Sequence, residues 1–397
     1  MKKIFLTRLT FLLLICIGLT NCTDPYKMQT DTFEDALVVE ATITNVLQKQ
    51  TIKVSRTYRF EDFGPSFEEN ADVLVTDSDG NEYPFVQSNN TYVSVNAFQA
   101  EPGKQYRLTV ITSDGKKYTS SQEVLPADNP LDDVTATVQT IDNVTGVEIR
   151  AKSYDPNSTS QYYRFEYEET YKIVAPKWIT SKAYFSGPNP NQPILTMLPR
   201  TEEARICYST DKSTEILLFN SNETTEDRVD FPVRFISDQN YIMSHRYSIL
   251  VRQYVQNSHS YNYYKSLKKL SGSGTILSPN QPGFLIGNIK SVNNPSEKVI
   301  GYFDVSAVST KRIFFNYADL FPGKPLPPYK VNCTELSQKY CFSTLDPSCN
   351  GPSVVGYINT NVMVIYKFDD APIYILTPAP CGDCTSFSSN VIPSFWE

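Results

Sequence analysis

The residues best suited to chemistry are six cysteines that follow Cys22 in the chain. Five of them lie in the last 65 residues, where Cys381 and Cys384 form a C-x-x-C pair. Such a pair is typical of half a zinc site, of a redox centre, or of two arms of a disulfide framework. The compartment decides between these, because disulfides persist in exported proteins but are rare in the cytosol. The six candidates are Cys207, Cys333, Cys341, Cys349, Cys381 and Cys384.

The first residues of the chain indicate export. Lys2, Lys3 and Arg8 accompany a mostly apolar run over residues 9–19. This run is about half the length needed to cross a bilayer, so residues 1–21 are predicted to be a signal peptide. It ends in Leu-Thr-Asn-Cys, which resembles the bacterial lipobox, where cleavage precedes a cysteine that receives lipid. We therefore expect acylation of Cys22, with residues 22–35 as a lipidated tether. The alternative is an ordinary secretory signal, in which Cys22 is only another cysteine.

Export favours a structural role for the remaining cysteines. Six is an even number, and we expect three disulfides, although the spacing leaves 15 pairings open. A zinc site built from Cys349, Cys381, Cys384 and one other residue is the first alternative. A redox pair is the second, but such motifs begin a helix after a strand, and the segment after Cys384 has no helical periodicity. The prediction is therefore disulfides, with no metal and no cofactor.

The charge and composition of the chain limit the classes of molecule that it can bind. Loss of the signal peptide removes three of 36 basic residues and no acidic ones, so the net charge falls from −7 to −10. Phosphate contacts need clustered Lys and Arg, and no extended cluster exists, which argues against nucleic acid and against anionic lipid surfaces. We expect the membrane to be reached only through the N-terminal lipid. A hydrophobic content of 40% is ample for folded cores, and the mature length favours two or three domains.

The pattern of apolar residues predicts a mainly β chain. Six or seven alternating strands across residues 36–128, with tight turns at Asp79-Gly80 and Asp114-Gly115, favour an N-terminal immunoglobulin- or transthyretin-like β-sandwich. A second β-rich domain is predicted over residues 129–320, with one short helix over residues 257–270. The helix is indicated by apolar residues at helical spacing: Tyr261, Tyr264, Leu267 and Leu270.

Residues 321–397 differ in amino-acid composition from the two predicted domains that precede them. They are rich in proline and cysteine, and we expect a disulfide-rich C-terminal region of loops that packs on the second domain. Within it, only the segment VMVIYKF at residues 362–368 is predicted to form a strand.

No catalytic set is apparent, and we predict that the protein is not an enzyme. The two histidines, His245 and His259, lie before a strand and at a helix start, which makes a Ser-His-Asp set or a histidine-rich metal centre hard to assemble. Carboxylates could serve glycoside hydrolysis, but those on one tyrosine-rich strand are better explained as a solvated face: Glu166, Glu168 and Glu169. Several tyrosines could stack on sugars or peptides, although core packing explains at least half of them: Tyr162, Tyr163, Tyr261, Tyr263 and Tyr264.

Taken in order, the segments resemble a known family. LVVEATIT, the hairpin ADVLVTDSDGNEYPF, YRLTVITSDGKKYTSS, YYRFEYEETY and YSILVRQYVQNSHSYNYYKSLKKL are similar to segments of a Bacteroidota lipoprotein family known as domain of unknown function 4249. GFLIGNIKSVNNPSEKVIGYFDVSAVSTKRIFF, the Cys207-Tyr208 pair and the C-x-D-C ending with its terminal tryptophan add to the likeness. Ser388-Ser389 departs from it, because glycine is expected there. The resemblance implies an outer-membrane lipoprotein, often surface-facing and often encoded beside SusC-like TonB-dependent transporters.

Two functions follow as expectations. The first is a non-enzymatic outer-membrane lipoprotein, lipid-anchored and facing the cell exterior, that acts as an accessory or binding partner of a TonB-dependent barrel. The alternative is a surface glycan- or peptide-binding protein or a hydrolase. The resemblance assigns no catalytic residues, so none is carried over to this chain.

Overall fold

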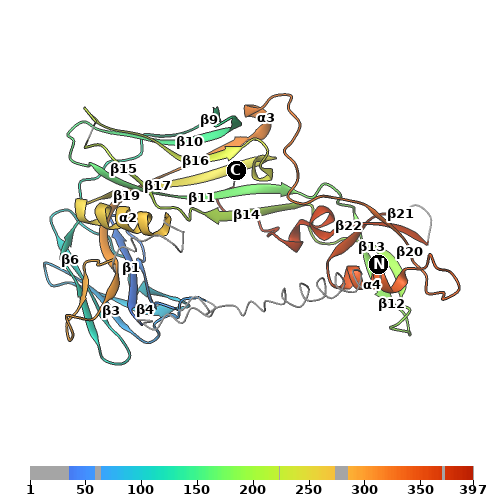
Figure 1. Cartoon of the computed structure of the whole chain (residues 1–397), viewed down its shortest axis with the longest axis horizontal. Helices are drawn as coiled ribbons and strands as arrows, with labels where there is room; N and C mark the ends of the chain where they lie inside the picture. The colour runs from blue at the N-terminus through green and yellow to red at the C-terminus, as the bar shows by residue number, and fades with distance from the viewer. Residues whose placement is uncertain (1–34, 59–63, 223, 273–284, 369–371, 397) are drawn as a thin grey trace, which may run out of the picture.

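The computed structural model describes residues 35–58, 64–222, 224–272, 285–368 and 372–396 (Figure 1). Strands account for 49% of the structure and helices for 11%, which confirms the prediction of a mainly β chain. The predicted signal peptide and Cys22 lie outside the described residues. No helix in the described ranges is both long and apolar enough to cross a membrane.

The N-terminal strands form the predicted β-sandwich around one core. Side chains alternate between buried and exposed along the strands, and the buried ones include Val39, Leu108 and Tyr118. This period of two is what a half-buried sheet requires. The strands are β1 (Leu37–Thr44), β2 (Thr51–Arg56), β3 (Asp72–Asp77), β4 (Glu82–Ser88), β5 (Thr91–Ser94), β6 (Gln105–Ile111), β7 (Lys117–Ser120) and β8 (Glu123–Val124).

The two Asp-Gly turns lie where the sequence predicts them. Gly80 joins β3 to β4 with φ of 86°, and Gly115 joins β6 to β7 with φ of 82°. A residue with a Cβ atom rarely adopts such angles, so glycine is the natural choice at both turns.

The first turn is organised by a buried carboxylate. Asp77 accepts hydrogen bonds from the backbone N–H of Asp79 and Asn81, at 3.0 and 2.9 Å, and from the Tyr83 hydroxyl at 3.0 Å. Lys104 Nζ adds an ion pair at 3.4 Å. Burial alone would raise the pKa of Asp77, but the hydrogen bonds outweigh it and lower the pKa from 3.8 to about 2.

This lowered pKa predicts a loss of stability in acid. Because the folded pKa lies below the unfolded one, the contribution of Asp77 is complete above about pH 4 and is lost as the pH falls through 2. One proton changes the free energy of unfolding by at most ~1.4 kcal/mol per pH unit. Urea unfolding between pH 5 and 2 measures the slope. Asp77→Asn should reduce that slope, and an unchanged slope in the variant would contradict the assignment.

The second part of the chain is a sandwich whose larger sheet continues into the first. The order β14-β11-β17-β19-β1 is hydrogen-bonded throughout, and β16-β10-β9 form the covering sheet. The two sheets enclose a second core that includes Ile149, Phe165 and Val251. The strands are β9 (Asp133–Ile141), β10 (Val144–Asp155), β11 (Tyr162–Val174), β14 (Ile206–Lys212), β15 (Leu217–Asn220), β16 (Asp227–Ser237), β17 (Arg246–Gln256), β18 (Ile289–Ser291) and β19 (Val299–Asn316).

One long strand joins the two bodies. The first half of β19 pairs in parallel with β1, from Leu37–Val299 to Thr44–Ser306. Its second half pairs antiparallel with β17, from Val255–Ala307 to Arg246–Asn316. β18 also returns to the first sheet, where it pairs with β7. Residues far along the chain therefore complete the N-terminal sheet.

The predicted helix is present as α2 (Ser258–Gly272). It lies over the junction between the two bodies (Figure 1) and buries Tyr261 and Tyr263. Tyr264, Leu267 and Leu270 are half-buried. The periodicity of the sequence identified this face correctly, apart from Tyr263.

The C-terminal region is more regular than its composition indicates. In place of loops with one strand, a three-stranded sheet in the order β20-β22-β21 packs with the hairpin β12–β13 around Val354 and Leu376. Short helices also went unpredicted, because each spans few turns. The elements of the chain not yet given are β12 (Ser181–Ser186), β13 (Ile194–Pro199), η1 (Tyr241–Met243), α3 (Tyr317–Leu320), β20 (Leu336–Lys339), α4 (Gly351–Asn359), β21 (Met363–Phe368), β22 (Ile373–Pro378), α5 (Ala379–Gly382) and η2 (Cys384–Ser386).

Candidate functional site

The six cysteines downstream of Cys22 form three disulfides, as predicted. Their pairs are Cys207–Cys384, Cys333–Cys381 and Cys341–Cys349. The two cysteines of the C-x-x-C pair are therefore bonded to different partners, not to each other. This arrangement contradicts both alternatives, because neither a redox pair nor four zinc-binding thiolates can form from these sulfurs.

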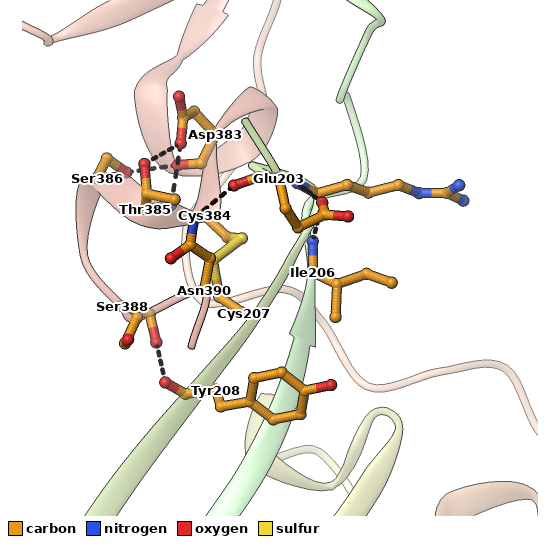
Figure 2. The surroundings of a disulfide bond; sticks show 12 residues. Glu203, Ile206, Cys207, Tyr208, Asp383, Cys384, Thr385, Ser386, Ser388 and Asn390 are labelled. Carbon is orange, nitrogen blue, oxygen red and sulfur yellow. Dashed lines mark hydrogen bonds between the residues drawn. A yellow bond between two sulfur atoms is a disulfide. The ribbon is translucent and has the colours of Figure 1, made fainter. Parts of the chain in front are cut away.

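The Cys207–Cys384 disulfide attaches the C-terminal tail to strand β14. Figure 2 shows the bond between β14 and the segment that follows α5. Tyr208 and Ser389 exchange two backbone hydrogen bonds, at 2.7 and 3.3 Å. The Ser388 hydroxyl donates to the carbonyl of Tyr208 at 2.8 Å (Figure 2). Both cysteines are completely buried, so this disulfide has a structural role.

The end of the tail lies on the same sheet. The ring centroid of Trp396 lies 5.0 Å from that of Tyr208 and 5.8 Å from that of Phe314. The guanidinium of Arg312 lies 3.5 Å from the ring centroid of Phe395. The outer face of this sheet is thus covered by the tail at one end.

One cluster of metal-ligand residue types is explained by a disulfide. Cys341, Asp346 and Cys349 lie close together, but the two sulfurs are bonded to each other. The carboxylate of Asp346 accepts a hydrogen bond from Lys339 Nζ at 2.7 Å. The cluster therefore offers neither thiolates nor a free carboxylate to a metal ion.

The two histidines are placed as the sequence predicts. His245 directly precedes β17, and His259 is the second residue of α2. Burial, with a smaller contribution from Lys172, lowers the pKa of His245, which favours the neutral ring. The structure does not bring the two histidines into one element or one cluster.

The three glutamates of β11 are each held by arginine. Glu166 pairs with Arg164, and Glu168 lies 3.4 Å from Arg312 and 3.7 Å from Arg252. Glu169 is buried, where it accepts a hydrogen bond from the Tyr247 hydroxyl at 2.6 Å and pairs with Arg234 at 3.1 Å. The sequence interpretation of all three as a solvated face was therefore incomplete, because Glu169 points into the core.

A buried arginine connects these glutamates to α2. Arg164 is only 7% exposed and lies between two rings, 4.2 Å from the Tyr254 centroid and 4.8 Å from the Tyr264 centroid. Glu166 also accepts a hydrogen bond from the Tyr254 hydroxyl at 3.1 Å. A guanidinium stacked on aromatic rings and paired with a carboxylate offsets part of its desolvation cost. Arg164 Nε nevertheless has no partner in the described structure.

A cavity of about 710 Å³ opens beside this arginine. That volume lies in the range of small-ligand sites. Its walls come from elements far apart in the chain: β1, β2, β11, the β14–β15 connection, β17, α2 and β19. The charged lining is balanced, with Arg164, Lys212 and Arg252 against Glu40, Glu166 and Glu215. The aromatic lining is Phe165, Tyr167, Tyr254, Tyr263, Tyr264 and Tyr302.

Only some of the predicted aromatic candidates meet at this cavity. Tyr263 and Tyr264 line it, whereas Tyr163 is fully buried in the core. The rings of Tyr162 and Tyr261 pack against each other, with their centroids 5.1 Å apart. Arg164, Arg252 and Tyr254 were not singled out from the sequence. Alternation along their strands is the only signal they carry, and it does not reveal which residues of other strands lie beside them.

Comparisons with known proteins point to one family. The family model described as Domain of unknown function (DUF4249) matches residues 23–312. This stretch contains all the residues that line the cavity and ends before the C-terminal cysteines, which the resemblance had included. No curated protein matches the chain.

Proposed function

The chain belongs to the Domain of unknown function (DUF4249) family, and from this premise we propose a non-enzymatic role at the bacterial surface. The protein is an outer-membrane lipoprotein that is anchored through Cys22 and faces the cell exterior. It acts as an accessory or binding partner of a TonB-dependent transporter of the SusC-like kind found in Bacteroidota.

The observation that carries the proposal is the pairing of all six cysteines downstream of a lipobox-like Cys22. Each of the six is bonded in the structure, and disulfides of this kind persist in oxidising compartments. An exported chain with a cysteine directly after its signal peptide has the features of a lipoprotein. Acyl chains at Cys22 would hold the folded part at the membrane.

The arrangement of charged groups supports a binding role over a catalytic one. Glycoside hydrolysis needs two carboxyl groups that flank the scissile bond and are free to act on it. Glu166, Glu168 and Glu169 are each paired with an arginine of the protein itself. This pairing favours a structural role for the three carboxylates over contact with a substrate.

Purification from detergent-solubilised outer membranes tests the proposal. The full-length protein, tagged at the C-terminus, should recover a TonB-dependent barrel in comparable amount by mass spectrometry. The control variant Cys22→Ala removes the acylated sulfur and should recover little barrel, since it is no longer held at the membrane. Repeated recovery of the wild-type lipoprotein without a barrel would contradict the proposal.

The cavity beside Arg164 favours a second candidate, the binding of a glycan or peptide at the surface. Tyr263 is only 9% exposed and packs against Tyr302 at 5.3 Å, so its replacement would disturb the fold. Arg252→Ala is the cleaner test, because Arg252 lies half-buried at the cavity. A ligand found on a polysaccharide or peptide array should bind this variant at least tenfold more weakly. Equal binding would exclude the cavity as its site.

A further inference from the structure

Strand β9 forms an open edge of the second sandwich. It is the last strand in the order β16-β10-β9 and lies at the top of the molecule in Figure 1. It pairs with β10 along its full length, from Asp133–Lys152 to Ile141–Val144. On its other side, no strand among the described residues pairs with it.

The register shows which backbone groups face outward. The two residues of the turn, Asp142 and Asn143, both have positive φ, so Ile141 and Val144 form a hydrogen-bonded pair. In an antiparallel ladder such pairs alternate. The backbone carbonyl of Thr145 accordingly faces away from β9, since it accepts a hydrogen bond at 2.9 Å from the N–H of Asp238, which directly follows β16. It follows that the outward N–H and C=O groups of β9 include those of residues 136, 138 and 140.

The composition of β9 leaves this edge unprotected. From Val134 to Ile141 the sequence is VTATVQTI, with no charge, proline or glycine. Edge strands are normally protected by lysine, proline or a bulge, because open backbone groups pair readily with other chains. Residues 137–141 are all exposed, and Val138 is 40% exposed.

The opposite edge of the same sheet has the usual protection. Strand β16 contains Pro232 and four charged residues, and its register with β10 shifts at Ile149–Arg150. The edge of β14 is partly covered by the C-terminal tail through Ser389. The contrast between β9 and β16 indicates that the open edge of β9 has a use.

We propose that the open edge of β9 is a docking site that accepts an extended strand from a partner protein. Main-chain hydrogen bonds to residues 136, 138 and 140 would provide the affinity, as in other complexes formed by strand addition. This inference rests on the proposed function and identifies the partner as the TonB-dependent barrel. It goes further by naming the surface and the conformation of the bound segment.

Charge at the two ends of β9 defines the chemistry of that segment. Asp132 precedes the uncharged stretch and Asp142 follows it, whereas Asp133 is already paired with Lys311 at 3.0 Å. A matching strand is therefore uncharged in its centre and basic at its ends. A second copy of β9 is the competing occupant. Pairing of residue 136 with residue 138 would place Asp132 opposite Asp142, and like charges directly opposite are destabilising. Pairing of residue 138 with residue 138 avoids this conflict, so the crosslink at position 138 has to distinguish the barrel from a second copy.

Proline substitution removes the docking groups selectively. Ala136→Pro/Val138→Pro removes two N–H groups that face outward and none that bonds β10, and proline is tolerated at such edge positions. Retained disulfides and melting temperature will confirm folding. If this variant does not fold, Val138→Lys places a charge at the same edge.

The test combines purification with photo-crosslinking in native outer membranes. Barrel recovery should fall at least tenfold in the proline variant or, if that variant does not fold, in Val138→Lys. A photoreactive residue at position 138 should crosslink to the barrel. Position 86 is the matched control, because Val86 is 53% exposed but lies on β4, between two paired strands.

Each outcome separates the inference from the proposed function. Unchanged barrel recovery with no crosslink at position 138 overturns the inference and leaves the proposed function standing. A crosslink to a second copy of this chain overturns the assigned occupant. Failure of the wild type to recover any barrel overturns the proposed function, and the inference falls with it.

Discussion

Replacing both Cys207 and Cys384 with serine is expected to lower the free energy of unfolding by about 5 kcal/mol. The disulfide joins residues separated by 177 positions, and the chain entropy released from such a loop in the unfolded state corresponds to about 5 kcal/mol. It also holds the tail that covers β14. Denaturant titration of the oxidised wild type and of the variant measures the difference.

A second disulfide provides the matched control. Cys341 and Cys349 are separated by only 8 positions, and the same relation gives about 2.5 kcal/mol for their removal. The variant Cys341→Ser/Cys349→Ser should therefore lose about half as much stability. Equal losses in the two variants would contradict the view that the long disulfide stabilises the fold by closing a long loop.

Replacing Gly301 with alanine is expected to destabilise the protein by more than about 4 kcal/mol. A Cβ atom at this position would lie 2.0 Å from the carbonyl oxygen of Val39. Gly301 also has φ of 130°, an angle that residues with a Cβ atom rarely adopt. The backbone of β1 or β19 must move, which breaks the parallel pairing that joins the two bodies. Losses of this size come from such steric conflicts in buried structure.

The variant Gly80→Ala separates the effect of a positive φ from the effect of a steric conflict with a neighbouring strand. Gly80 has φ of 86°, but a Cβ atom there meets nothing within 4 Å, so the expected loss is about 1 kcal/mol. Urea unfolding of both variants gives the comparison, and hydrogen exchange in β1 should rise only in Gly301→Ala. A loss at Gly301 no larger than that at Gly80 would show that β1 and β19 do not need this close approach.

Local periodicity was sufficient to predict much of this fold. The segments that became β1, β3, β6 and α2 show clear periods of 2 or 3.6 residues, and the Asp-Gly turns between strands require positive φ. The return of β18 and β19 to the N-terminal sheet could not be predicted in this way. Nothing in their own residues indicates which distant strand they will meet, since pairing depends on the geometry of the whole sheet.

The candidate sites show the same limit. Export and an even number of cysteines predicted disulfides, but spacing alone does not select one pairing out of 15. The cavity depends on Arg164, whose surroundings come from Tyr254 on β17 and Tyr264 on α2. In the sequence, Arg164 is one charged residue in a tyrosine-rich strand. Its burial is a consequence of tertiary packing.

The central claim is that this chain is an exported, acylated and oxidised lipoprotein. Intact-mass analysis of the protein purified from its native membranes, with and without thiol alkylation, tests this claim most directly. The account predicts a mature chain that begins at Cys22, carries the mass of a diacylglyceryl group and an N-acyl chain, and has no thiol available for alkylation before reduction. A chain with no added lipid mass, in which the six cysteines downstream of Cys22 are alkylated before reduction, would contradict it.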